Sequence, residues 1–182
     1  MSTGYQIRDQ AAMYFVTNTI VDWVDVFTRQ RYRDIVIDSL NFCISQKCLE
    51  VHGYVIMSNN LHMLLRSSSA NLSDTIRDFK RFTARNIIDT IRNAPDESRR
   101  EWMLHRFGWH GRNNILNTEN QFWIHDNRPE EIYSQKFFLQ KLNYIHENPV
   151  RAGIVARAEE YVYSSAATII LGKQGLIPIK MD

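Results

Sequence analysis

The sequence predicts an α+β fold in which an antiparallel sheet packs against helices. The run Met13–Val21, rich in β-branched and aromatic residues, indicates a strand, and two further strands are expected at Leu49–Met57 and Leu61–Arg66. Longer segments between and after them have apolar residues at helical spacing. The resulting order of strand, helix, hairpin, helix and a later strand is typical of a sandwich built on a split βαβ unit.

Each element of the first half follows from its local sequence. The strand at Met13–Val21 is followed by a helix expected over Thr28–Lys47, in which Ile35 and Leu40 lie on one face. The second and third strands are expected to form a hairpin, because the Ser-Asn pair between them is turn-like. A helix over Ser73–Ile91 comes next, with Ser73 as its predicted N-cap.

The second half is predicted to be less regular. We expect a helix near Glu97–Arg106, and Gly108–Asn120, rich in Gly and Asn, is predicted to be a long loop. Ser134–Glu147 is predicted to be a helix that stops at the Asn-Pro pair after it. Short strands are expected at Gln121–Ile124 and Gly153–Val155.

Composition indicates one globular domain. The 182 residues are 44% apolar and 23% charged, so we predict a single domain over residues 1–182, with a core at about 11–156 and a tail at 157–182. A net charge of +2 excludes a histone-like polycation but leaves room for a local basic stripe.

No membrane or export segment is evident in the sequence. Met1–Gln10 lacks the apolar run of a signal peptide, and no stretch approaches the length of a membrane helix. The spacing of Cys43 and Cys48 fits neither a CxxC pair nor a zinc knuckle, so we expect two reduced thiols and a cytoplasmic protein that does not bind membranes.

Asn60 and His62 are candidate metal ligands. In a strand the two side chains point to the same face, roughly 7 Å apart. An imidazole nitrogen could bind a divalent metal there, with the Asn60 carbonyl as a weaker oxygen donor. The alternative is a surface or hydrogen-bonded histidine with no metal.

Tyr144 and Asn148 form the second candidate pair. Four residues apart near a helix end, they share one helical face. A tyrosine hydroxyl is a weak nucleophile at its usual pKa near 10 and needs a metal or base beside the reacting phosphate. A packed tyrosine, with an asparagine that ends the helix, is the alternative.

Basic residues are unevenly distributed. Arg77, Lys80, Arg81 and Arg85 recur at steps that place a basic stripe along one helical face, as phosphate binding requires. Aromatic residues lie among further cations downstream, a combination that single-stranded nucleic acid uses for stacking. These aromatic residues are Trp102, Trp109, Phe122 and Trp123. A solvated basic face with buried aromatic residues is the alternative.

The chain resembles the REP-associated tyrosine transposases, and more broadly the single-tyrosine transposases with a His-hydrophobic-His motif. The resemblance is strongest in Tyr54–Leu64, which contains Ser-Asn-Asn-Leu-His-Met-Leu, and in Tyr144–Val155, which reads Tyr-Ile-His-Glu-Asn-Pro-Val-Arg-Ala-Gly-Ile-Val. Further matches in the same order are Asp78–Thr83, Glu97–Met103 and Tyr163–Ser165.

This resemblance implies a ferredoxin-like or RRM-like sheet, with a C-terminal helix that carries the tyrosine. It also implies an enzyme, a transposase that cuts and joins single-stranded or hairpin DNA. Tyr144 would be the nucleophile, forming a covalent 5′-phosphotyrosine and releasing a 3′-hydroxyl. His62, Asn148 and Asn60 would hold Mg²⁺ or Mn²⁺, and we add Lys141 and Arg151 to the expected DNA contacts.

The chain departs from the family pattern in two places. Asn60 stands where the family has its first metal histidine, and Arg128 stands in Asp126–Pro129 where relatives often have histidine. The alternative function is therefore a domesticated protein that binds such DNA without cutting it. A third hypothesis is an RNA-binding α+β protein. The sequence leaves both a homodimer and a monomer open.

Overall fold

A four-stranded antiparallel sheet forms the centre of the molecule. The computed structural model describes residues 6–114, 119–126 and 128–181. Within them the strand order is β2-β3-β1-β4. The strands are β1 Tyr14–Thr19, β2 Leu49–Ile56, β3 Asn60–Ser67 and β4 Glu130–Glu131. Because β3 is antiparallel to both neighbours, β1 and β2 are parallel with β3 between them. The predicted α+β fold, with an antiparallel sheet and packed helices, is confirmed.

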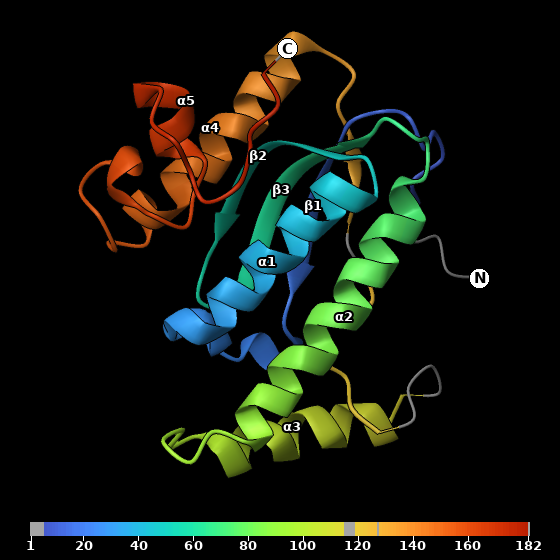
Figure 1. Cartoon of the computed structure of the whole chain (residues 1–182), viewed down its shortest axis with the longest axis vertical. Helices are drawn as coiled ribbons and strands as arrows, with labels where there is room; N and C mark the ends of the chain where they lie inside the picture. The colour runs from blue at the N-terminus through green and yellow to red at the C-terminus, as the bar shows by residue number, and fades with distance from the viewer. Residues whose placement is uncertain (1–5, 115–118, 127, 182) are drawn as a thin grey trace.

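Helices cover both faces of this sheet. Figure 1 shows α1 and α2 side by side in front of it, with α3 below and α4 beside α5. The helices are α1 Gln30–Gln46, α2 Leu72–Arg92, α3 Arg100–Arg112, α4 Gln135–Arg151 and α5 Ala166–Leu171, with short 3-10 turns η1 Val21–Trp23, η2 Val26–Thr28 and η3 Ala158–Glu160. His62 of β3 faces α4, so Val16 and Met63, which are fully buried in the alternate row, face α1 and α2.

The predicted start of α2 and the predicted end of α4 both need correction. Helix α2 begins two residues earlier than predicted, with Asn71 rather than Ser73 at its N-cap. Helix α4 does not stop before Pro149 but continues to Arg151. A proline there removes only one N–H late in the helix, and the chain still closes its last turn through Ala152 N to the Asn148 oxygen at 3.0 Å.

The predicted loop at Gly108–Asn120 is wrong at its start, because α3 continues to Arg112. The two glycines serve close packing here. A Cβ on Gly111 would lie 2.4 Å from the Glu119 carbonyl oxygen, so only glycine allows the backbone at Glu119 to pass so close to α3. Residues 115–118 of the predicted loop lie outside the described residues.

The expected edge strand at Gly153–Val155 is also wrong. That segment is a turn in which Gly153 has φ 69°. The free edge of β2 is instead covered further along the chain. Ile56 N donates to the Tyr163 carbonyl at 2.9 Å, and Ser165 N donates to the Tyr54 carbonyl at 3.0 Å. Residues of the predicted tail therefore pair with the central sheet.

Ser165 and His146 connect α4 to this edge. Ser165 Oγ lies 2.9 Å from His146 Nε2 and accepts a hydrogen bond from Tyr54 N at 3.0 Å. Both side chains are buried. Since an unpaired polar group would be costly at this depth, the contact fixes where α4 rests on β2.

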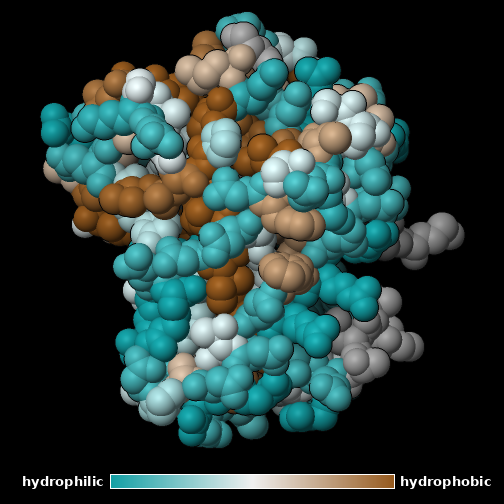
Figure 2. Space-filling view, viewed as in Figure 1, coloured by the Kyte–Doolittle hydropathy of each residue, from teal (hydrophilic) through white to brown (hydrophobic). Residues whose placement is uncertain are grey.

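The surface is mostly polar on the face shown in Figure 2, where hydrophilic colours predominate over the lower part and apolar colour gathers at the upper left. Among the described residues, exposed apolar side chains of the C-terminal segment include Val162, Ile170, Leu171 and Leu176. No helix in the described ranges is long and apolar enough to cross a membrane. Cys43 is buried and Cys48 is exposed, and both are free thiols.

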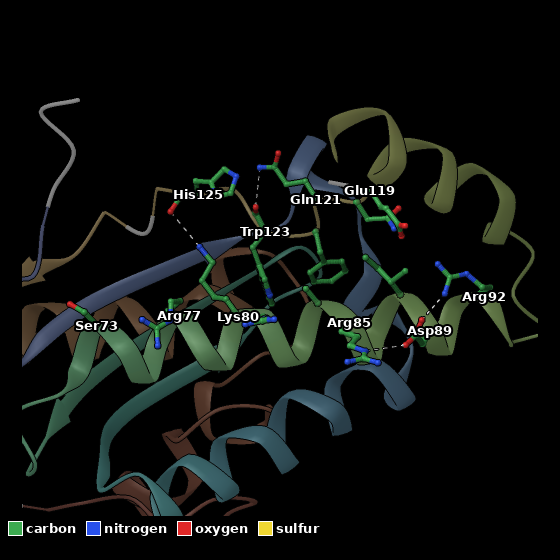
Figure 3. Close-up of a pocket in the computed structure, with 15 residues that line it drawn as sticks. Ser73, Arg77, Lys80, Arg85, Asp89, Arg92, Glu119, Gln121, Trp123 and His125 are labelled. Atoms are coloured by element: carbon green, nitrogen blue, oxygen red, sulfur yellow. Dashed lines mark hydrogen bonds and ion pairs between the residues drawn. The ribbon is translucent and has the colours of Figure 1, made fainter. Parts of the chain in front are cut away.

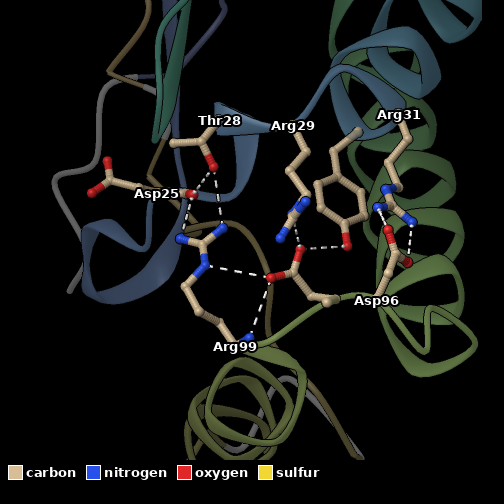
Figure 4. A network of polar contacts seen from close by, with 8 residues as sticks. Asp25, Thr28, Arg29, Arg31, Asp96 and Arg99 are labelled. Carbon is tan, nitrogen blue, oxygen red and sulfur yellow. Dashed lines mark hydrogen bonds and ion pairs between the residues drawn. The ribbon is translucent and has the colours of Figure 1, made fainter.

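A buried carboxylate joins the start of α1 to the segment before α3. Figure 4 shows Arg29 and Arg99 pointing toward one another from these two segments, and both guanidinium groups lie within ion-pair distance of Glu97. The Glu97 Oε2 atom lies 2.7 Å from Arg29 Nε and accepts a hydrogen bond from the Tyr32 hydroxyl at 3.1 Å. Burial opposes ionisation of Glu97, but the Arg99 amide, the Tyr32 hydroxyl and the two arginines outweigh it and lower its pKa. The neighbouring Asp96 pairs with Arg31 at the surface.

We expect Glu97→Gln to lower the free energy of unfolding by about 2 kcal/mol, since a fully buried charged acceptor is lost. Urea unfolding followed by circular dichroism would measure this. Asp96→Asn is the matched control, and it should leave the unfolding midpoint unchanged because its ion pair is exposed. Equal losses of unfolding free energy in Glu97→Gln and Asp96→Asn would contradict the stabilising role of the buried Glu97 carboxylate.

The stability should also depend on pH through His146. Burial lowers the pKa of His146 from 6.5 to about 4, so the unfolded chain takes up a proton that the folded protein resists. Its contribution is complete above pH 6.5 and is lost as the pH falls toward 4. Between pH 7 and pH 5, the free energy of unfolding should fall by about 2 kcal/mol less in His146→Gln than in wild type. His105→Gln, on the exposed surface of α3, should behave as wild type.

Candidate active site

The register of β1 against β3 places Thr17 opposite His62. The Thr17 hydroxyl lies 2.9 Å from His62 Nδ1, and the ring is only 7% exposed. One ring nitrogen is therefore held by a strand neighbour, which leaves Nε2 as the nitrogen available for other chemistry.

Tyr144 of α4 lies directly against this histidine. Its ring centroid is 5.2 Å from that of His62 and 5.9 Å from that of Phe15, edge-on in both cases. Ser134 caps the helix by accepting from Phe137 N at 3.2 Å. The Tyr144 side chain is 37% exposed, and its hydroxyl has no hydrogen bond among the described residues. The structure thus brings together Tyr144 and His62, two predicted residues that are far apart in the chain.

His62 is uncharged at neutral pH. Burial, and then the positive charge of Lys141, lower its pKa to about 4. Lys141 Nζ is 2.6 Å from Glu130 Oε1 and 4.4 Å from the centre of the Phe15 ring. A neutral imidazole can accept a hydrogen bond or bind a metal, which a protonated ring cannot do.

A pocket of about 420 Å³ opens beside this pair. Its described lining also holds Thr17, Thr19, Trp23, Asp126, Arg128 and Lys141. Neither Asn60 nor Asn148 is among the lining residues, so the structure does not bring these two predicted ligands into the pocket that Tyr144 and His62 share.

The two asparagines nevertheless keep oxygen atoms free. The Asn60 side-chain oxygen is buried and has no hydrogen-bond partner in the described residues, while its amide donates to Asn59 at 3.0 Å. The Asn148 amide donates to the Tyr144 carbonyl at 2.8 Å, which leaves the other side-chain atom as an acceptor. Such oxygens suit Mg²⁺ or Mn²⁺ in type. They carry no charge, and within the described ranges no cluster of three His, Cys, Asp or Glu residues could hold a metal.

The predicted basic stripe borders a groove of about 920 Å³ between α2 and residues 119–125. Arg77, Arg81 and Arg85 are exposed along it, and the opposite face of α2 is buried as predicted, at Ile76, Phe79 and Thr83. Arg77 forms ion pairs with Asp74 and Asp78, and Arg85 is 4.0 Å from Asp89.

Lys80 is directed differently from these arginines. Figure 3 shows it reaching from α2 to the chain that carries His125. Its Nζ donates to the Ile124 carbonyl at 2.8 Å and to the His125 carbonyl at 3.4 Å. Burial lowers its pKa to about 8, against the opposing effect of Asp126. Lys80 thus holds a backbone segment in place, and a phosphate would have to displace these contacts.

That segment separates the groove from the pocket. Trp123 and His125 line the groove, whereas Ile124 and Asp126 line the pocket. The alternation follows from its extended conformation, in which Ile124 N donates to the Thr19 carbonyl at 2.8 Å beside β1. The groove and the pocket are therefore neighbours across a single extended chain.

The remaining predicted contacts differ in position. Arg151, in the last turn of α4, places its guanidinium carbon 5.8 Å from the centre of the Tyr144 ring. Phe122 and Trp123 are buried, whereas Trp102 and Trp109 are about half exposed on α3. No local pattern singles out Trp23, which the structure places in the lining of the pocket.

Comparison with known proteins supports the fold. No family model and no curated protein matches the sequence. The structure is similar to a solved structure described as a REP-associated tyrosine transposase bound to a REP hairpin, with a TM-score of 0.62. The match covers 100% of this chain and 93% of that chain at 14% sequence identity. At this identity the similarity establishes a shared fold.

Lys80→Met should loosen the segment at residues 123–126, because two carbonyl oxygens lose their donor. We expect its amides to exchange hydrogen faster and the free energy of unfolding to fall by about 1 kcal/mol. Hydrogen–deuterium exchange with mass spectrometry would show this. Arg81→Met removes the same charge from the adjacent exposed position and should leave exchange in the segment unchanged.

Proposed function

We propose that this protein binds single-stranded or hairpin DNA and that it cleaves and rejoins a strand through Tyr144. The observation that carries the proposal is the position of Tyr144. Its partly exposed ring, with a hydroxyl free of hydrogen bonds to described residues, lies 5.2 Å from a buried neutral imidazole in an open pocket. The shared fold with a transposase bound to a DNA hairpin is consistent with this function.

Strand cleavage and strand rejoining would be two separate steps. The Tyr144 oxygen would attack the scissile phosphorus and lose its proton, while the bond to the 3′ oxygen breaks and that oxygen takes up a proton. This leaves a 5′-phosphotyrosine and a free 3′-hydroxyl. In rejoining, a 3′-hydroxyl would attack the phosphotyrosine and release Tyr144 as the protonated phenol. His62 would remain neutral in both steps, because its pKa is about 4.

We propose that side-chain donor atoms of Asn60, His62 and Asn148 hold Mg²⁺ or Mn²⁺. Such an ion would neutralise charge on the phosphate oxygens when bound. All three side chains are neutral, so the negative charge that binds the ion would come from the DNA itself. We therefore expect metal binding in the presence of DNA to be much tighter than without it.

The groove along α2 offers a path for the DNA backbone. Arg81 has no ion pair among the described residues, and Arg77 and Arg85 stand on the same exposed face. A strand lying there would need only to cross the segment at residues 123–126 to reach Tyr144. Phosphate binding of this kind would weaken steeply with salt.

Covalent trapping tests the proposal. A DNA hairpin with single-stranded flanks is incubated with the protein and Mn²⁺ or Mg²⁺, then separated under denaturing conditions. We expect a protein–DNA adduct with 3′-labelled DNA and none with 5′-labelled DNA, because the 5′ phosphate joins the tyrosine. Tyr144→Phe should abolish the adduct. Tyr133→Phe, which alters a tyrosine 77% exposed just before α4, is the matched control and should preserve it.

A protein that binds DNA without cutting it is the second candidate. The neutral donor set favours it, because Asn60 supplies only an uncharged amide oxygen and no cluster of three His, Cys, Asp or Glu residues in the described ranges could hold a metal. In this case wild type would bind the hairpin without forming an adduct, and Asn60→His would restore the adduct. Absence of any binding to single-stranded or hairpin DNA would overturn both candidates.

A further inference from the structure

Trp23 is an exposed aromatic side chain at the entrance to the Tyr144 pocket. Its side chain is 66% exposed, yet it lines the same pocket as His62 and Tyr144. The other exposed tryptophans, Trp102 and Trp109, lie on α3 and line neither the pocket nor the groove. An indole ring left this open to water gains little from burial, so packing does not account for its presence.

The backbone that presents Trp23 is held in an unfavourable conformation. Asp22 and Trp23 both have left-handed φ values, 53° and 52°, which a residue with a Cβ seldom adopts. Trp23 N donates to the Ile20 carbonyl at 3.1 Å, and the Asn59 amide donates to the Trp23 carbonyl at 3.3 Å. His110 Nε2 lies 2.8 Å from Asp22 Oδ1. One hydrogen bond within the turn and contacts from two other parts of the chain, Asn59 and α3, thus fix the turn and the position of the ring.

We propose that Trp23 stacks on a nucleobase of single-stranded DNA bound in the Tyr144 pocket. This inference rests on the proposed function and identifies the residue whose ring would contact the base. The pocket pairs this aromatic ring with Lys141 and Arg128, which are ion-paired in the same lining with Glu130 at 2.6 Å and Asp126 at 3.8 Å. Phosphates on either side of a stacked base would compete with these carboxylates for the two cations. A purely apolar ligand fits less well, because charged side chains form much of the lining.

Binding of fluorescein-labelled oligothymidylate of about 20 nucleotides, followed by fluorescence anisotropy, tests the stacking. Because stacking tolerates any base, the unknown target sequence does not limit the experiment. We expect Trp23→Ala to raise Kd by about 5- to 100-fold and Trp23→Phe to raise it much less. The slope of log Kd against log salt should stay the same, since no cation is lost. Phe42→Ala, which removes an exposed ring from α1 outside both the pocket and the groove, should bind as wild type.

Trp23→Gly separates loss of stacking from loss of folding. Glycine accepts the left-handed backbone without strain, so the variant should melt at the wild-type temperature or higher while binding as weakly as Trp23→Ala. Wild-type affinity in Trp23→Gly, or an equal loss in Phe42→Ala, would overturn the stacking role and leave the proposed function intact. If wild type binds neither oligothymidylate nor a DNA hairpin, the proposed function itself fails.

Discussion

The pairing of β1 with β3 is the constraint on which the candidate site depends. Its register sets Thr17 opposite His62 and Thr19 opposite Asn60, on the face that α4 covers. A slip of one residue would turn these side chains toward α1 and α2 and would bring the alternate row to the other face. That row includes Val16, which is fully buried. Burial on one face therefore fixes the chemistry on the other.

Helix α4 is fixed to this sheet along a narrow line of contact. Ile145 is fully buried, and Tyr144 and His146 lie on either side of it, each about 100° around the helix. His146 meets Ser165 at the β2 edge, while Tyr144 meets His62 above β3 and Phe15 above β1. Because the buried polar contact on one side has only one satisfied geometry, the rotation of the helix, and so the position of the tyrosine, is determined.

The side chains in direct contact with Tyr144 and His62 are mostly uncharged, and charged side chains lie around them. The groups closest to Tyr144 are a neutral imidazole and an aromatic ring, and the cations Lys141 and Arg151 approach from α4. Lys141 is already balanced by Glu130. In the proposed function, the phosphodiester would supply negative charge beside the neutral donors of Asn60, His62 and Asn148, so strand binding and metal binding would depend on each other.

The sequence by itself determined the first three strands, the order of α1 to α4 among them, the buried face of α2 and the elements that carry His62 and Tyr144, because alternation and helical spacing are local properties. It did not predict β4 or α5. It misplaced the end of α4, since a proline near a helix terminus costs a single hydrogen bond that neighbouring contacts offset. Only the tertiary structure decided which predicted residues meet. It turned Lys80 inward, kept the two asparagines out of the Tyr144 pocket and placed Trp23 at its entrance. These outcomes depend on strand register and on contacts between distant segments, which no local pattern encodes.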